Sequence, residues 1–113
     1  MRVLIIDDSP SILECTRALL ESHGHEVETC AGMFEASFHM GSQTDVVVCD
    51  GFDGVGPNFL QAVRSLHPNT LTILHSADSA LVEAEKARGY CAIVKGDSWQ
   101  ELLAAVGEKV GVR

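Results

Sequence analysis

The sequence of 113 residues is poor in aromatic side chains, proline and positive charge. Eight Lys and Arg stand against sixteen Asp and Glu, and the resulting net charge of −8 opposes direct binding to nucleic acid and favours cations or basic partners. No apolar run approaches the roughly 20 residues of a membrane span, and no signal-peptide pattern is present. The four cysteines lack CxxC spacing, so we expect buried free thiols in a reducing cytoplasm.

What is present is an ordinary globular composition, with 46% hydrophobic and 21% charged residues. Five short apolar segments alternate with five amphipathic ones, and we expect the apolar segments to be strands at residues 2–6, 26–30, 46–49, 70–74 and 90–94. The amphipathic segments predict helices at about 10–23, 33–40, 59–66, 79–88 and 98–110. This alternation predicts one α/β domain over residues 1–113, with a parallel sheet covered by helices on both faces.

The third predicted strand is the most informative stretch. Val46 to Cys49 is apolar and mostly β-branched, as in a strand buried on both faces, and Asp50 follows at its carboxyl end. Ligands of such sheets bind outside the carboxyl ends of the strands. Four of the predicted strands lead into polar groups at that edge, namely Asp7 and Asp8, Asp50, Ser76, and Lys95.

Three carboxylates at one edge repel one another by about 4 kcal/mol per pair at ~4 Å and an effective dielectric constant of ~20. Lys95 offsets one negative charge and leaves a net charge of −2, which suits a divalent cation. An all-oxygen donor set favours Mg²⁺. A carboxylate beside Mg²⁺, an ammonium and a hydroxyl can attack phosphorus and form an acyl phosphate.

Four segments, in this order and at these distances, resemble the receiver domains of the bacterial two-component response regulators. They are Ile5-Ile6-Asp7-Asp8-Ser9, Val47-Val48-Cys49-Asp50, Leu74-His75-Ser76-Ala77 and Ile93-Val94-Lys95. The resemblance covers essentially the whole chain. It implies a doubly wound, flavodoxin-like sheet of five parallel strands in the order 2-1-3-4-5, with five helices.

The resemblance also implies a role for each polar residue at the edge. Asp50 would accept a phosphoryl group from a histidine kinase or phosphotransfer protein. Asp8 and Asp50 would bind Mg²⁺ directly, Asp7 would act through water, and the Phe52 carbonyl would complete the ligand set. Ser76 would hydrogen-bond the phosphoryl oxygen and Lys95 would pair with it. The phosphorylated protein would act on a downstream protein target or output domain, in the cytoplasm, without being an enzyme for other substrates.

Several positions depart from the family pattern. Asp53-Gly54 stands where the family usually has a Met-Pro pair, a few residues after the phosphoacceptor. The glycine expected some residues after the phosphoacceptor corresponds to Asn58, and the proline after the lysine is replaced by Gly96. The aromatic residue of the fifth strand, which relays the signal in the family, is replaced by Ala92. Tyr90 is two residues earlier, about 6.6 Å away at ~3.3 Å per residue, and cannot simply take its place.

Three other interpretations explain this pattern less well. A pseudo-receiver, acting as a phosphate-independent interaction module, would not need the acidic residues, Ser76 and Lys95. A hydrolase of the haloacid-dehalogenase type would need a second Asp two residues after its nucleophile, and Asp7-Asp8-Ser9 lacks that spacing. A flavin binder of flavodoxin type would need a hydroxyl-rich phosphate loop after the first strand, where Asp7 and Asp8 would repel a phosphate.

Overall fold

The computed structural model describes residues 1–96 and 99–111. Its strands form one parallel sheet in the order β2-β1-β3-β4-β5, which confirms the predicted fold class. The strands are β1 (Arg2–Ile6), β2 (Glu26–Cys30), β3 (Val46–Cys49), β4 (Leu71–Ser76) and β5 (Cys91–Val94). The helices are α1 (Pro10–Ser22), α2 (Met33–His39), α3 (Gly56–Leu66), α4 (Ser79–Ala87) and α5 (Trp99–Gly111), with a 3₁₀ turn η1 (Phe52–Gly54) before α3.

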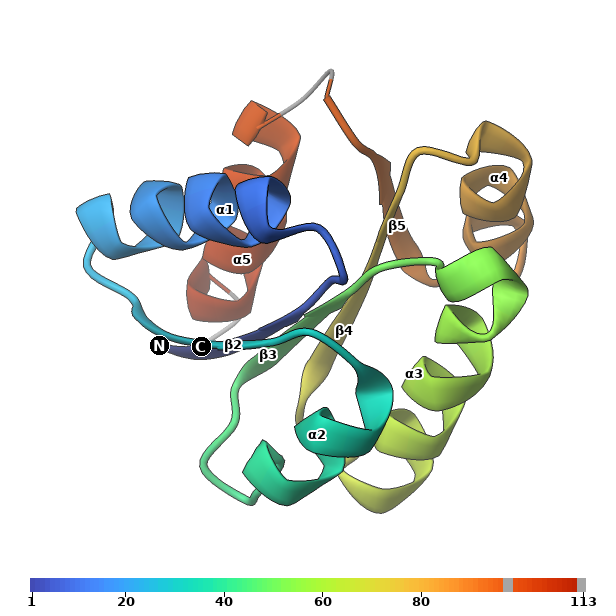
Figure 1. Ribbon diagram of the computed structural model, residues 1–113. Coiled ribbons are helices and arrows are strands. Elements are labelled where there is room, and N and C mark those ends of the chain that lie inside the picture. Colours follow the sequence, from blue (N-terminus) through green and yellow to red (C-terminus); the bar gives the residue numbers. More distant parts are fainter. Residues whose placement is uncertain (97–98, 112–113) are drawn as a thin grey trace.

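The sheet has helices on both of its faces (Figure 1). It separates two hydrophobic cores because successive side chains of a strand point to opposite faces. Helices α1 and α5 cover one face, where Leu20, Leu102 and Val106 are fully buried. Helices α2, α3 and α4 cover the other face, where Ala36, Leu60 and Val82 are fully buried. All four residues of β3 are buried, as predicted for a strand with helices on both sides.

Local signals in the sequence explain where α1 begins and ends. The Ser9 hydroxyl accepts a hydrogen bond from the Ile12 N–H at 3.5 Å, and Pro10 occupies the first helical position, where its missing N–H is not needed. Gly24 adopts φ +88°, a left-handed conformation that stops the helix. The predicted start of the last helix, at residue 98, lies outside the described residues.

Some predicted details were wrong. Strand β4 runs to Ser76 instead of ending at Leu74, because the Lys95 N–H donates to the Ser76 carbonyl at 2.9 Å and prolongs its pairing with β5. All four cysteines are free, but Cys15 is exposed on α1 instead of buried. Within the described residues, no helix combines the length and the apolarity needed to cross a membrane.

Candidate functional site

The carboxyl ends of four adjacent strands bring the predicted polar residues together. Asp7 directly follows β1, Asp50 follows β3, Ser76 ends β4 and Lys95 follows β5. Backbone hydrogen bonds fix the residues that follow β3 and β5. The Asp50 N–H donates to the Ile6 carbonyl at 2.8 Å, and the Lys95 N–H donates to the Ser76 carbonyl. The parallel register therefore sets the spacing of the site.

The three carboxylates form one cluster. Asp7, Asp8 and Asp50 each offer an oxygen, and these atoms all lie within 4.8 Å of one another. Asp7 is buried, Asp50 is half-buried and Asp8 is exposed, so the cluster opens to solvent on the Asp8 side. Backbone donors hold the carboxylates in place: the Ser9 N–H donates to Asp7 Oδ1, and the Phe52 N–H to Asp50 Oδ2, both at 3.0 Å.

Lys95 supplies the positive charge of the site. Its Nζ lies 2.6 Å from Asp7 Oδ2 and also pairs with Asp50 Oδ1. Burial works against the charged ammonium, but hydrogen bonds to Asp50 and Asp7 outweigh it, and the pKa of Lys95 is raised above its ordinary value. Three carboxylates and one ammonium leave a formal charge of −3 + 1 = −2. This set of oxygen donors fits a hard divalent cation such as Mg²⁺.

The loop after Asp50 is tightly turned and strained. Phe52 and Asp53 have φ values of 43° and 52°, the left-handed region that non-glycine residues rarely adopt. The Phe52 carbonyl, the predicted metal ligand, accepts the Val55 N–H at 3.0 Å, and a carbonyl has a second lone pair for a cation. Left-handed residues cost on the order of 1–3 kcal/mol each and concentrate at functional sites.

Two glycines let neighbouring chain segments approach Asp50 closely. A Cβ at Gly51 would lie 2.8 Å from Ser76 Oγ and 2.8 Å from Leu81 Cδ2. A Cβ at Gly56 would lie 2.1 Å from the Asp50 carbonyl oxygen. Gly56 was not predicted from the sequence, although a glycine before Pro57 at a helix start was a usable signal. Its position requires glycine because backbone occupies the space of a side chain.

Ser76 is tied to the start of α4. Its Oγ accepts the Asp78 N–H at 3.0 Å, and the Asp78 carboxylate in turn caps α4 by accepting the N–H groups of Ala80 and Leu81. Asp50, Ser76 and Lys95 line one small pocket, together with residues of the loops after β3 and β4. A group attached to Asp50 would therefore meet both the hydroxyl and the ammonium.

The pKa values of two side chains near Asp50, those of Cys49 and His75, keep both groups uncharged at neutral pH. Burial, with the negative charges of Asp50 and Asp7, raises the pKa of the Cys49 thiol to about 12, although Lys95 opposes the shift. Burial and the charge of Lys95 lower the pKa of His75 to about 4, with Asp50 acting in the opposite direction. At pH 7 the thiol therefore stays protonated and the imidazole neutral.

The aromatic residue that the resemblance implies on β5 has no direct substitute in this chain. Ala92 is buried, and Tyr90 lies just before the strand, whereas the sequence predicted it within the strand. The guanidinium of Arg64 lies 3.5 Å from the centre of the Tyr90 ring. Gly96 has φ +91°, and no described residue has a cis peptide bond.

The sequence matches no protein-family model and none of the curated proteins compared with it. A response regulator from Thermotoga maritima is 25% identical, with a TM-score of 0.82 and a match covering 97% of each chain. The response regulator TrrA of the same organism, solved in complex with Mg²⁺-BeF, is 26% identical over 96% of this chain and 97% of its own, with a TM-score of 0.82. A CheY-like receiver domain protein from Methanospirillum hungatei is 26% identical over 98% of this chain and 94% of its own, with a TM-score of 0.83. The resemblance predicted from the sequence is confirmed: this chain is similar in structure, over nearly its whole length, to response regulator receiver domains.

Proposed function

We propose that this protein is a phosphoacceptor receiver of a two-component system, in which Asp50 takes a phosphoryl group from a histidine kinase or phosphotransfer protein. The observation that carries the proposal is the position of Lys95, whose Nζ joins Asp50 to Asp7 beside a third carboxylate. An ammonium placed in this way can pair with a phosphoryl oxygen once Asp50 has become an acyl phosphate and its carboxylate charge is lost. A phosphate-independent interaction module has no need of this arrangement.

In the proposed reaction, a carboxylate oxygen of Asp50 forms a bond to phosphorus while the bond from phosphorus to the donor's imidazole nitrogen breaks. Lys95 stabilises the charge on the transferred group. The Ser76 hydroxyl already accepts the Asp78 N–H, so its own proton can be donated to a phosphoryl oxygen. Later attack by water on the acyl phosphate returns free Asp50 and inorganic phosphate. No substrate beyond this self-modification is proposed.

Mg²⁺ is the proposed cofactor, because the oxygen donors and the formal charge of −2 fit it. Asp8 and Asp50 would hold it directly, Asp7 through water, and the Phe52 carbonyl would complete the set. When bound, Mg²⁺ neutralises negative charge on the phosphoryl group. We place this chemistry in the cytoplasm, where Cys15 and the other free thiols would stay reduced. The phosphorylated form would act on a protein target or an output domain.

The test is phosphorylation by acetyl phosphate and Mg²⁺, followed by intact-mass spectrometry. The wild-type protein should gain one base-labile phosphate, as expected for an acyl phosphate. Asp50→Asn should remain folded and gain none. Asp53→Asn is the matched control, because this exposed carboxylate is only three residues away and asparagine tolerates its left-handed backbone. Unchanged labelling of Asp50→Asn would refute the assignment.

A further inference from the structure

The exposed apolar side chains of this protein gather on one side of the sheet. In the described residues, the exposed large hydrophobic side chains are Phe34 and Phe38 of α2 together with Val55 and Leu66 at the two ends of α3. Phe34 and Phe38 are 79% and 74% exposed, and their rings pack edge to face with their centroids 5.2 Å apart. Single exposed hydrophobics are common, but two exposed aromatic rings in contact on a seven-residue helix form an apolar patch of the kind found at contact surfaces.

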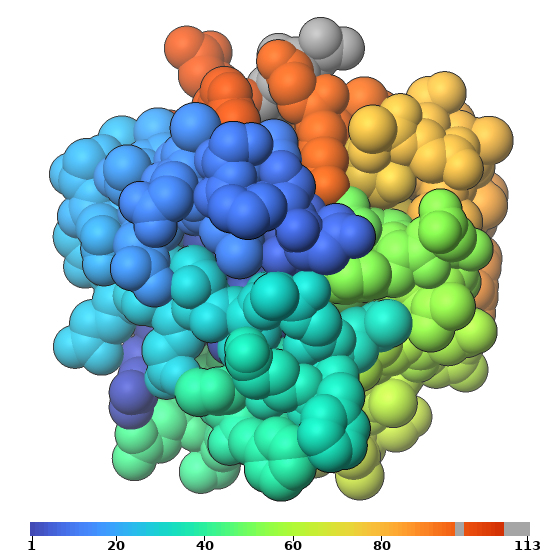
Figure 2. Space-filling view, in the orientation of Figure 1, coloured from blue at the N-terminus to red at the C-terminus, as the bar shows by residue number. Residues whose placement is uncertain are grey.

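Phe34 and Phe38 are exposed although another face of α2 is buried in the hydrophobic core. Helix α2 points Ala36 into the core and packs Met33 and Met40 against it, so Phe34 and Phe38 occupy the opposite, outward face. In the space-filling view, the part of the chain around α2 forms the lower front of the molecule (Figure 2). Large rigid aromatic side chains are the residues most enriched at protein–protein contacts.

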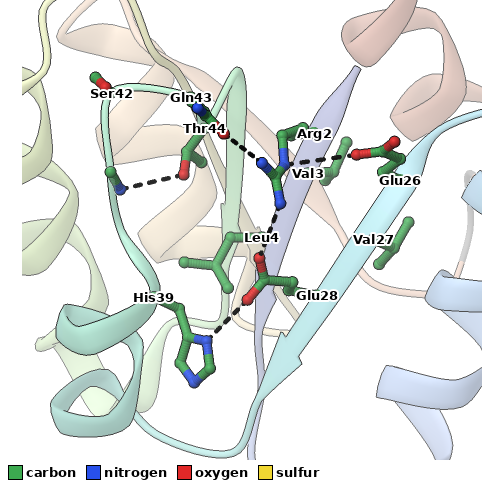
Figure 3. Close-up of a pocket in the computed structure, with 11 residues that line it drawn as sticks. Arg2, Val3, Leu4, Glu26, Val27, Glu28, His39, Ser42, Gln43 and Thr44 are labelled. Atoms are coloured by element: carbon green, nitrogen blue, oxygen red, sulfur yellow. Dashed lines mark hydrogen bonds and ion pairs between the residues drawn. The ribbon is translucent and has the colours of Figure 1, made fainter.

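A polar hollow lies beside the carboxyl end of α2. Its walls are β1, β2, the end of α2 and the loop before β3, and its lining includes Arg2, Glu26, Glu28 and His39 (Figure 3). Glu28 pairs with His39 Nδ1 at 2.8 Å, which joins the hollow to α2. The hollow exists because α2 ends at His39 and the chain returns to β3 as a loop. We call Phe34, Phe38 and this hollow the α2 surface.

The charge of the α2 surface is negative. The lining of its hollow includes the carboxylates of Glu26 and Glu28, and Glu35 is exposed on α2 itself. Among the described residues that line the hollow, Arg2 is the one cation apart from the titratable His39, and it pairs with Glu26 at 3.5 Å and Glu28 at 3.7 Å. These carboxylates remain 78% and 48% exposed, so their pairs with Arg2 are weak and open to a second cation.

We propose that the α2 surface binds a partner protein through a basic amphipathic segment. Apolar side chains of the partner would cover Phe34 and Phe38, and a Lys or Arg would enter the hollow beside Glu26 and Glu28. A second copy of this chain is a poor occupant, because its net charge of −8 would bring like charges together. Arg2, which lines the hollow, and Asp7, which follows β1, are about 16 Å apart at ~3.3 Å per residue, so the hollow is separate from the acidic cluster around Asp50.

The probe is a fluorescent Leu/Lys amphipathic peptide of about 18 residues, long enough to form a helix. An otherwise identical Leu/Glu peptide tests the charge. Fluorescence anisotropy, with saturating Mg²⁺ to mask the other acidic cluster, should show binding of the Leu/Lys peptide only. Phe34→Ser/Phe38→Ser should weaken this binding by about tenfold or more, since central aromatic residues commonly dominate binding energy. The control Leu66→Ser, with an equally exposed side chain on α3 (76%), should bind within about twofold of wild type.

Charge and folding are tested separately. Glu26→Gln/Glu28→Gln should weaken Leu/Lys binding and reduce its salt dependence. Phe34→Ser/Phe38→Ser should keep the wild-type melting curve and the wild-type rate of phosphorylation by acetyl phosphate, so that a failure here is distinct from a failure of the proposed function. Equal binding by the double Phe variant, or equal binding of the Leu/Glu peptide, would overturn the proposal. Sedimentation showing a dimer that the double Phe variant loses would overturn it too, by assigning the surface to a second copy.

Discussion

Gly56→Ala is the sharpest test of how the phosphoacceptor loop is built. The new Cβ would lie 2.1 Å from the Asp50 carbonyl oxygen, against 3.4 Å for an ordinary contact, so the two backbones must separate by about 1.3 Å. Overpacking of this kind costs about 1–3 kcal/mol. The Gly56 N–H also donates to the Gly51 carbonyl at 2.9 Å, and losing that bond adds roughly 1 kcal/mol. We expect Gly56→Ala to lower the free energy of unfolding by about 2–4 kcal/mol.

The displacement of the Asp50 backbone should also lower the rate of phosphorylation. Because a misplacement of about 1 Å can reduce a rate roughly 100-fold, phosphorylation by acetyl phosphate should be strongly slowed in the folded variant. Urea denaturation and a phosphorylation time course measure the two effects. Gly41→Ala is the control: a Cβ added at Gly41 would have no atom within 4 Å and the backbone there is not left-handed, so stability should change by less than about 1 kcal/mol. Wild-type stability and rate in Gly56→Ala would refute the expected clash, and a loss of stability alone would show that α3 moves and Asp50 does not.

Three further predictions concern the metal, pH and signalling. Mg²⁺ at tens of millimolar should raise the melting temperature by mass action, and Asp8→Ala should abolish the rise without destabilising the metal-free protein, because a repulsion is removed; an unaffected wild-type curve would exclude a working metal site. The pKa of His75 is about 4 in the folded protein against an ordinary value of 6.5, so below pH 6.5 the unfolded chain binds the proton first and stability falls toward pH 4. Between pH 6.5 and pH 4 the free energy of unfolding should fall by about 3 kcal/mol, at about 1.36 kcal/mol per pH unit. Urea denaturation of His75→Phe should show a correspondingly smaller fall in the free energy of unfolding. Beryllofluoride, which mimics the phosphoryl group, should shift the NMR signals of residues 76–78 and leave Ala92 and α5 little changed, since alanine has no side chain to swing; large shifts at Ala92 would show an intact relay.

The positive φ of Phe52 shows where sequence patterns stop being informative. The glycines at positions 51, 54 and 56 are typical of a tight or mobile loop, but nothing in their spacing points to a bulky residue in a left-handed conformation. That conformation is retained because the surrounding structure holds both sides of the loop: Asp50 Oδ2 accepts the Phe52 N–H, and Gly56 packs on the Asp50 carbonyl. Such constraints come from segments that meet only in the folded state.

The sheet and its order of elements follow from local properties of the chain. Val46 to Cys49 is apolar on both faces and therefore predicts a central strand, while Ser9, Pro10 and Gly24 set the limits of α1 through capping and backbone geometry. These are short-range effects of side-chain burial and allowed dihedral angles, which sequence patterns express directly. For the same reason the acidic residues at the strand ends could be assigned to one edge from the sequence alone.

Tertiary structure alone decided what those residues touch. The pairing of Lys95 with both Asp7 and Asp50, the packing of the Tyr90 ring on Arg64, and the outward position of Phe34 and Phe38 join residues that are far apart in sequence or depend on which helix face meets the sheet. Sequence periodicity places an apolar residue on a helix, but the direction of the helix on the sheet decides whether it is buried. Helix α2 turns Ala36, Met33 and Met40 toward the sheet, and its two phenylalanines remain in solvent because they lie on the opposite face.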